Sequence, residues 1–172
     1  MSDWNQGKQK PKLPLRLAAV TAAAALAAAD QLAKNAAAQH LPRTGMRTLV
    51  PGVLGLRFTV NTGISFSMFG GSQAAMAAVT VLTGIVMLAG IFAILLGKLR
   101  GAAWLGGAPL ILAGGIGNWL DRAFQGYVVD YFEFLFVRFA VFNLADVFIT
   151  CGVVWLSFWL IVEDARKKKK TL

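Results

Sequence analysis

Polar side chains gather between residues 114 and 146 of a chain whose other long stretches are mostly apolar. They include Asn118, Asp121, Arg122, Asp130, Glu133, Arg138, Asn143 and Asp146. An ionised carboxylate at the centre of a membrane helix costs about 2.5 to 3.5 kcal/mol, so acidic residues inside membrane proteins usually mark a functional site. We therefore expect the chemistry of the protein to lie in this stretch.

Asp130 and Asp146 are the residues best suited to catalysis. Two carboxyl groups that meet in a site of low dielectric cannot both ionise cheaply, so they share one proton. One then acts as a base and the other as an acid, as the activation of a water molecule against an amide bond requires. The amide nitrogens of Asn118, Asn143 and Asn61 can donate hydrogen bonds to a substrate backbone or a developing oxyanion. A structural role for each Asn is an equally good interpretation.

Other charged residues are expected to form ion pairs. Asp121 and Arg122 are neighbours in the sequence, and we expect them to satisfy each other or nearby backbone groups. Asp30 and Lys34 lie one helical turn apart, where opposite charges attract. We therefore assign Asp30, Lys34 and Asp121 to structure rather than to chemistry.

Composition places the chain among membrane proteins. Of its 172 residues 57% are hydrophobic and only 15% are charged, with a mean hydropathy of +0.62. The net charge of +9 comes from Lys and Arg outside the apolar runs, so membrane topology and anionic lipid explain it better than nucleic acid. The single Cys151 excludes an intramolecular disulfide and a multi-cysteine metal site.

Four apolar segments predict membrane-spanning helices at about 15–33, 74–96, 102–120 and 140–162. A span of 23 residues, such as the second, crosses a hydrocarbon core of about 30 Å at about 1.5 Å per residue. The expected organisation is a single integral domain at 15–162, outer loops at 34–73 and 121–139, and basic tails at 1–14 and 163–172. A cleavable signal peptide also fits the first segment, but the charged pair at its outer end favours a retained helix.

The first outer loop predicts a small β-sheet. Apolar and other residues alternate from Leu54 to Val60, which is the period of a half-buried strand, and Pro51-Gly52 is a type II turn signal. Residues 46–50 are then the partner strand. The predicted fold class is an all-α membrane protein with four transmembrane helices and a small extracytoplasmic sheet between the first two.

The distribution of basic residues predicts the orientation. Eleven of the 17 Lys and Arg residues lie in the two tails and in the turn after the second span, all on one side of the predicted membrane. Because cytoplasmic loops carry an excess of these residues, both termini are expected in the cytoplasm. Asn61, Asp130 and Asp146 then lie near the outer face.

Five segments together resemble the motifs of bacterial lipoprotein signal peptidases (signal peptidase II), which are membrane aspartic proteases. They are Asp30-Gln31-Leu32-Ala33-Lys34, Asn61-Thr62-Gly63-Ile64-Ser65-Phe66, Gly117-Asn118-Trp119-Leu120-Asp121-Arg122, Val128-Val129-Asp130-Tyr131 and Phe142-Asn143-Leu144-Ala145-Asp146. Each segment alone is a weak pattern, but their order and spacing make the resemblance specific. Val147 departs from it, standing where the family commonly has a small polar residue.

The resemblance implies that Asp130 and Asp146 are the catalytic pair. It implies site-shaping or substrate-binding roles for Asn61, Gly63, Asn118, Arg122 and Asn143. The implied substrate is a prolipoprotein whose cleavage-site Cys carries diacylglyceryl, cut on the amino side of that Cys. The expected enzyme is a monomer in the bacterial cell (inner) membrane that contacts membrane lipid and needs no metal or cofactor.

Other interpretations of the polar cluster stay open from the residues alone. A small ion- or proton-coupled transporter or channel subunit also places Asp and Asn inside the membrane. Against it, the acidic groups gather at one face and no internal repeat is evident. A scaffold without chemistry, and a carboxylate site for a hard cation, are the remaining alternatives.

Overall fold

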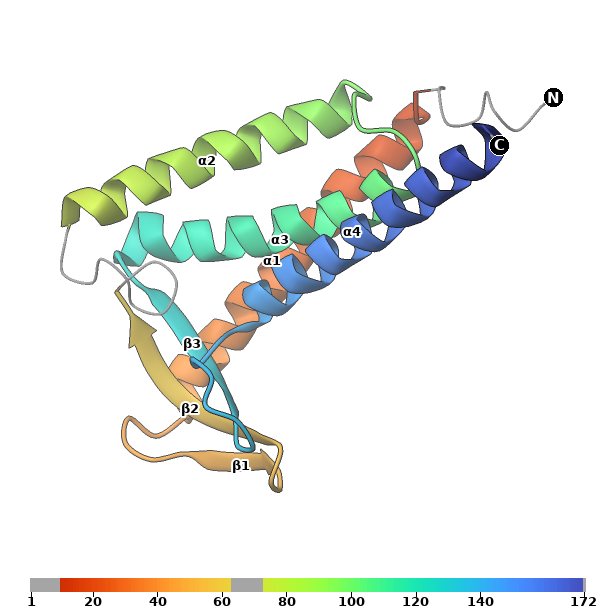
Figure 1. Ribbon diagram of the computed structural model, residues 1–172. Helices are drawn as coiled ribbons and strands as arrows, with labels where there is room; N and C mark the ends of the chain where they lie inside the picture. The colour runs from red at the N-terminus through yellow and green to blue at the C-terminus, as the bar shows by residue number, and fades with distance from the viewer. Residues whose placement is uncertain (1–9, 63–72, 172) are drawn as a thin grey trace.

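The computed structural model describes residues 10–62 and 73–171, and within them the chain is mostly helical with one small sheet (Figure 1). Its elements in chain order are α1 (Leu13–His40), β1 (Arg47–Val50), β2 (Leu54–Asn61), α2 (Gln73–Leu95), α3 (Ala102–Gln125), β3 (Val128–Phe134) and α4 (Leu144–Thr171). The predicted site residue Gly63 lies outside the described residues.

Three of the helices described are long and apolar enough to cross a membrane: α1, α2 and the Leu144–Arg166 part of α4. The third predicted span corresponds to α3, which has 24 residues but is not among the three. Glycines, Pro109 and the polar residues near its C-terminal end lower the hydropathy of α3. Length therefore permits α3 to span, whereas composition alone does not identify it.

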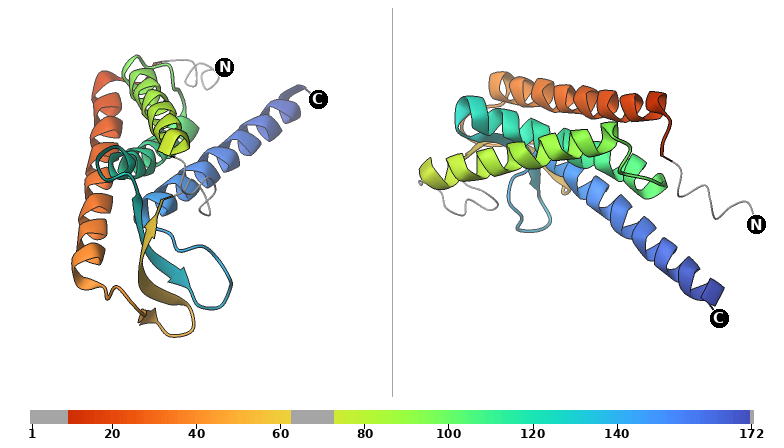
Figure 2. Two further views of the ribbon diagram at one scale, coloured as in Figure 1. Left: turned by 90° about the vertical axis from the view of Figure 1, so that its left-hand side faces the viewer. Right: turned by 90° about the horizontal axis from the view of Figure 1, so that it is seen from above.

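Helix α3 is the centre of the bundle and packs against α1, α2 and α4. The N-terminal end of α4 lies beside α3, and α4 diverges from the other helices toward its C-terminal end (Figure 2). The start of α1, the turn between α2 and α3, and the end of α4 lie at one end of the molecule, and the sheet lies at the other (Figure 1). The connections alternate between these two ends.

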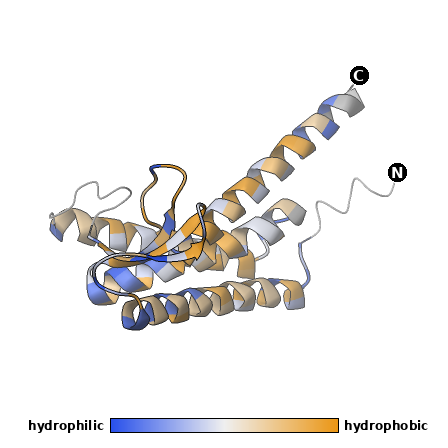
Figure 3. Cartoon of the chain, turned by 90° about the horizontal axis from the view of Figure 1, so that it is seen from below, coloured by the Kyte–Doolittle hydropathy of each residue, from blue (hydrophilic) through white to orange (hydrophobic). Residues whose placement is uncertain are grey.

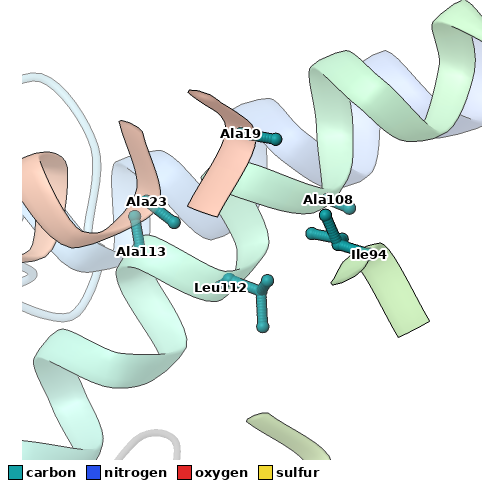
Figure 4. Close-up of a cluster of buried hydrophobic side chains, with 6 residues drawn as sticks. All are labelled: Ala19, Ala23, Ile94, Ala108, Leu112 and Ala113. Atoms are coloured by element: carbon teal, nitrogen blue, oxygen red, sulfur yellow. The ribbon is translucent and has the colours of Figure 1, made fainter. Parts of the chain in front are cut away.

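The buried core between the helices consists mainly of small side chains (Figure 4). Ala19 and Ala23 of α1, Ile94 of α2, and Ala108, Leu112 and Ala113 of α3 form it. Alanine at these positions lets the helix backbones approach closely, which is how helices associate in lipid. Large apolar side chains face outward instead, and the hydropathy colouring shows α4 hydrophobic along most of its length and hydrophilic near its C-terminal end (Figure 3).

Two glycines of α3 make room for the groups that build the polar end of the bundle. A methyl group on Gly114 would overlap the carbonyl of Ala145, in the first turn of α4. A methyl group on Gly117 would overlap the carboxylate of Asp30, on α1. Alanine at either position would therefore push α4 or α1 away from α3.

The sheet is antiparallel in the order β1-β2-β3. The hairpin prediction is confirmed: Val53 N donates to Val50 O at 3.1 Å, and Gly52 has the φ of +72° that a type II turn requires. The prediction that the sheet lies between the first two spans is incomplete, because its third strand, β3, follows α3. Residues 128–131 are all buried, so this strand shows none of the alternation that identifies β2.

The fourth helix begins at Leu144 rather than at residue 140. Phe142 instead pairs with Phe132 of β3, with Phe142 N donating to Phe132 O at 2.9 Å and Phe132 N to Phe142 O at 2.7 Å. This short bridge holds residues 140–143 extended, although they belong to one apolar run with the helix. As a result Asn143 stands immediately before α4 and not within it.

Candidate active site

Asp130 and Asp146 reach one end of the bundle on different elements. Asp130 lies on β3 and is paired in register with Thr59 of β2, while Asn61 at the end of β2 pairs with Val128. Asp146 lies in the first turn of α4. The Phe132–Phe142 bridge ties β3 to the residues that open α4, and it thereby fixes the strand carrying Asp130 beside the helix carrying Asp146.

The start of α4 is a reciprocal cap in which Asp146 takes part. Asn143 Oδ1 accepts a hydrogen bond from Asp146 N at 3.0 Å, and Asp146 Oδ2 accepts one from Asn143 N at 3.1 Å. This is the geometry of a capping box, with Asn143 in the capping position and Asp146 three residues later. The N-terminal end of the helix dipole also stabilises the negative charge of Asp146.

Two asparagine side chains join the aspartates. Asn118 Nδ2 donates to Asp146 Oδ1 at 2.9 Å, and Asn143 Nδ2 donates to Asp130 Oδ1 at 2.6 Å. Asn143 Nδ2 also donates to Asn118 Oδ1 at 3.1 Å, which closes the chain of contacts from one carboxylate to the other. Asn118 and Asn143, two of the three predicted site asparagines, therefore direct their amide groups at the aspartates.

The second oxygen of Asp130 is also satisfied. Asn61 Nδ2 donates to Asp130 Oδ2 at 3.0 Å. The Asp130 residue is 3% exposed, and this burial raises the pKa of its carboxyl group to about 6. The negative charge of Asp146 adds to the rise, whereas the donors Asn61 and Asn143 oppose it. Asp130 is therefore the aspartate whose environment favours holding a proton.

Asp130 and Asp146 line the same cavity, of about 620 Å³, which we call the helix-side cavity. Its wall includes Val79 and Thr83 of α2, Gly115, Asn118 and Arg122 of α3, and Val147, Thr150 and Cys151 of α4. Most of the lining is apolar, and it comes from α2, α3 and α4 together with β3 and residues 139–142 before α4. Neither aspartate forms an ion pair with any residue in the described part of the chain.

Arg122 is a cation on the wall of this cavity. Its Nη1 donates to the backbone oxygen of Asn118 at 3.4 Å, and its buried Nε has no hydrogen-bond partner among the described residues. Of the two partners predicted for Asp121 and Arg122, each other or nearby backbone, the structure shows backbone: Arg122 donates to Asn118 O and Asp121 Oδ2 accepts from Val129 N, while the ion pair of Asp121 is with Lys34. The two residues are adjacent in the sequence, but successive positions on a helix point in different directions.

The three residues assigned to structure form a buried charged cluster behind the aspartates. Lys34 Nζ lies 2.8 Å from Asp30 Oδ2 and 3.0 Å from Asp121 Oδ2, and all three side chains are at most 3% exposed. Asp30 Oδ1 also accepts a hydrogen bond from Ala145 N at 2.9 Å. The expected Asp30–Lys34 pair is present, and α1 thereby helps to cap the first turn of α4.

Lys34 links this charged cluster to the aspartate site. Its Nζ donates to Asn118 Oδ1 at 2.9 Å, and Asn118 Nδ2 donates in turn to Asp146. An ammonium group has only donors, so it must face the oxygen of the Asn118 amide. That contact turns the NH₂ group of Asn118 toward the carboxylate.

Comparison with known proteins identifies the family. A family model described as "Signal peptidase (SPase) II" matches residues 22–162. The chain belongs to the signal peptidase II family. Together with the three apolar helices, this makes it a multi-pass bacterial membrane protein of a peptidase family.

Individual relatives agree with this membership. A lipoprotein signal peptidase of Streptococcus pneumoniae (strain ATCC BAA-255 / R6) is 35% identical over 136 residues, covering 78% of this chain and 86% of that protein. One from Lactococcus lactis subsp. cremoris (strain SK11) is 37% identical over 140 residues, covering 81% and 90%. The sequence similarity thus extends over nearly the whole of each relative.

Solved structures share the fold. One bacterial membrane enzyme, determined by the in meso method at 2.3 Å resolution, superposes with a TM-score of 0.77 at 22% identity and covers 87% of this chain and 91% of its own. Another, at 1.9 Å resolution, has a TM-score of 0.73 at 23% identity, with coverages of 83% and 92%. The architecture of helices and sheet is therefore one already found in bacterial membrane enzymes.

Gln31 lies within one of the signal peptidase II motifs, but no site role was predicted for it. Gln31 Nε2 donates to Gly117 O at 3.0 Å and to Asp121 Oδ1 at 2.9 Å. It therefore connects α1 to the polar end of α3. Its position directly after Asp30 in the motif was the signal that could have identified it.

Proposed function

We propose that this member of the signal peptidase II family is an intramembrane aspartic endopeptidase that removes signal peptides from prolipoproteins. In this proposal the substrate carries diacylglyceryl on its cleavage-site Cys, and the bond on the amino side of that Cys is cut. The observation that carries the proposal is that Asp130 and Asp146 line one cavity, joined by amide donors and without an ion-pair partner in the described part of the chain.

The surroundings of the two aspartates favour different roles. Asp130 is buried with a raised pKa, so it holds the shared proton. Asp146 accepts two hydrogen bonds at the start of α4, which stabilise its charge. Asp146 then takes a proton from water as the water oxygen bonds to the carbonyl carbon, and Asp130 gives its proton to the carbonyl oxygen. Breaking the C–N bond, with a proton passed to the leaving nitrogen, completes the hydrolysis.

The remaining site residues support this reaction in different ways. Asn61, Asn118 and Asn143 hold the carboxylates in place through the contacts described above. The unpartnered Nε of Arg122 is available to an oxygen of the substrate. Gly63 keeps the site-shaping role implied by the family motif.

We also propose that α3 is a fourth span and that the sheet is extracytoplasmic. Lys and Arg are concentrated at the start of α1, in the turn after α2 and at the end of α4, which all lie at the end of the bundle opposite the sheet. The positive-inside rule places that end in the cytoplasm. Asp130 and Asp146 are then near the outer face, where a signal peptide leaves the bilayer.

A cleavage assay with purified protein in detergent tests the function. The wild type should cut a lipidated prolipoprotein at the amino side of the modified Cys, and Asp130→Asn and Asp146→Asn should each reduce the rate at least about a thousandfold, because each removes half of the acid–base pair. Asp164→Asn, at an exposed position on α4, is the matched control. Full activity in either dyad variant would refute the mechanism.

A second measurement distinguishes a transporter from the proposed peptidase. Proton-coupled flux into liposomes by protein that shows no hydrolysis would favour a transporter. Cleavage that is unaffected by chelators would remove the alternative of a carboxylate metal site.

A further inference from the structure

A second cavity, of about 850 Å³, meets the helix-side cavity at Asp130. We call it the sheet-side cavity; its wall includes Arg57, Thr59 and Asn61 of β2, Asp130 and Glu133 of β3, and Arg138 from the segment before α4. Asn61 and Asp130 belong to both cavities. A substrate held at Asp130 therefore has access to two compartments at once.

The two cavities differ in chemistry. Apart from the aspartate site and Arg122, the helix-side cavity is lined mainly by apolar residues of the helices, β3 and the segment before α4; the apolar residues Phe134, Phe139, Ala140 and Val141 also line the sheet-side cavity. The sheet-side cavity carries two Arg side chains and one Glu in addition to Asp130. An apolar signal peptide and its lipid suit the first. The segment that follows the cleaved bond is exported into water, and its polar side chains suit the second.

The charged residues of the sheet-side cavity are not fully neutralised. Arg57 Nε lies 2.6 Å from Glu133 Oε2, so these two form a pair across the strands. Arg138 is exposed and forms no ion pair with any residue of the 10–62 and 73–171 ranges. The wall therefore presents one uncompensated positive charge to a bound chain.

The strand geometry indicates where along the substrate these charges act. Four residues of β2 line the cavity: Arg57, Thr59, Val60 and Asn61. Arg57 is four residues from Asn61, or at most about 13 Å at about 3.3 Å per residue, because the strand pairing is irregular between Leu56 and Thr59. Asn61 contacts the catalytic candidate Asp130, so an extended substrate running along β2 reaches Arg57 about four residues beyond the cut bond.

We propose that the sheet-side cavity binds the first residues of the mature lipoprotein, and that Arg57, Glu133 and Arg138 make it prefer an acidic side chain about four residues after the cut bond. This rests on the proposed peptidase function and adds a specificity determinant to it. The preference is for Asp or Glu over a neutral residue, and for a neutral residue over Lys.

The test uses lipidated prolipoprotein peptides that differ at one position, with Asp, Asn or Lys placed in turn at the second to sixth mature residues. For the wild type kcat/KM should fall from Asp to Asn to Lys by about two- to fivefold per step, the range of a solvent-accessible ion pair. The effect should be largest near the fourth residue and should weaken at high salt. Equal kcat/KM for the Asp and Lys peptides at every position would overturn the proposal.

Charge variants locate the determinant. Arg138→Glu should reverse the preference, and Glu133→Gln should strengthen it by releasing Arg57. Arg47→Glu is the matched control, because Arg47 is an exposed arginine of the same sheet that does not line the cavity. A change as large in the Arg47 variant as in the Arg138 variant would show a general charge effect and would also overturn the proposal.

Failure of the subsite is distinguishable from failure of the proposed function. If the wild type cuts all peptides equally while Asp130→Asn cuts none, the peptidase stands and the subsite is wrong. If no peptide is cut, or if Asp130→Asn cuts as well as the wild type, the peptidase proposal fails and the subsite with it.

Discussion

Two pairs of acidic residues lie side by side at the polar end of this bundle, all buried except the half-buried Asp146, and their partners differ. Asp30 and Asp121 share one cation, Lys34, at 2.8 and 3.0 Å. Asp130 and Asp146 have only amide and backbone donors among the described residues. An ammonium group shared by two buried carboxylates holds their helices, α1 and α3, together. The proposed catalytic pair has no such cation among the described residues, and two carboxyl groups in one site can share a proton that a reaction then moves.

The comparison shows that burial alone does not mark a catalytic acid. Asp30 is 0% exposed and Asp121 1%, so both are as deeply buried as Asp130 at 3%. What distinguishes the catalytic candidates is that no described residue forms an ion pair with them and that a cavity lies beside them. Lys34 links the two clusters through Asn118, so the structural cluster also orients a donor for the site.

Removal of the shared cation should have the largest effect on stability. Lys34→Met leaves Asp30 and Asp121 buried without compensation, which should lower the free energy of unfolding by about 3 to 5 kcal/mol. Thermal unfolding in detergent measures the loss.

A matched control for Lys34→Met is available on α4. Lys168 and Asp164 have the same four-residue spacing as Lys34 and Asp30, but their side chains are 78% and 63% exposed. Lys168→Met should therefore change stability by less than about 1 kcal/mol. Equal losses in the two variants would mean that the buried cation has no special role.

The two acidic pairs should respond oppositely to loss of a charge. Asp121→Asn weakens the pair with Lys34 and should cost about 1.5 to 3 kcal/mol of unfolding free energy. Asp130→Asn breaks no ion pair, so it should change the unfolding free energy by less than about 1 kcal/mol. It removes the carboxyl group that acts as the acid, so it should abolish cleavage. Parallel melting curves and cleavage rates of the two variants test this. The contrast between the clusters would collapse if Asp130→Asn were the more destabilising.

Variants of Asn143 separate its two roles. Asn143→Ser keeps a good helix cap but loses the donor to Asp130, so it should reduce kcat while the protein stays nearly as stable as wild type. Asn143→Ala loses both the helix cap and the donor to Asp130, so its unfolding free energy should be about 1 kcal/mol lower than that of Asn143→Ser. Denaturation and turnover are measured for both variants. Identical stability of the Ser and Ala variants would argue against the cap.

The smallest expected effect is on the pH profile. The Asn61 amide stabilises the ionised form of Asp130, so Asn61→Ala should raise the Asp130 pKa above about 6. Because Asp130 acts in its protonated form, the limb on which cleavage falls with rising pH should move upward by roughly one pH unit. The pH dependence of kcat/KM measures the shift, with Asn35→Ala on the exposed face of α1 as control. A downward shift would mean that Asp130 acts as the base.

The sequence by itself determined the apolar segments, the β1–β2 hairpin and the identity of the polar residues. These follow from local patterns: runs of apolar residues, alternation along β2, and the spacing of Asp30 and Lys34. The motif order also pointed to Asp130 and Asp146 before any geometry was known. Each of these signals lies within a few neighbouring residues or in their order along the chain.

Only the tertiary structure decided which charges pair and which cavities meet. Lys34 and Asp121 are joined across the α1–α3 contact, and no local pattern relates them. β3 joins the sheet from beyond α3, and its fully buried residues lack the alternation that reveals a half-buried strand. Hydropathy and spacing report on one element at a time, whereas the ion pairs and the junction of the two cavities at Asp130 exist only once several elements pack together.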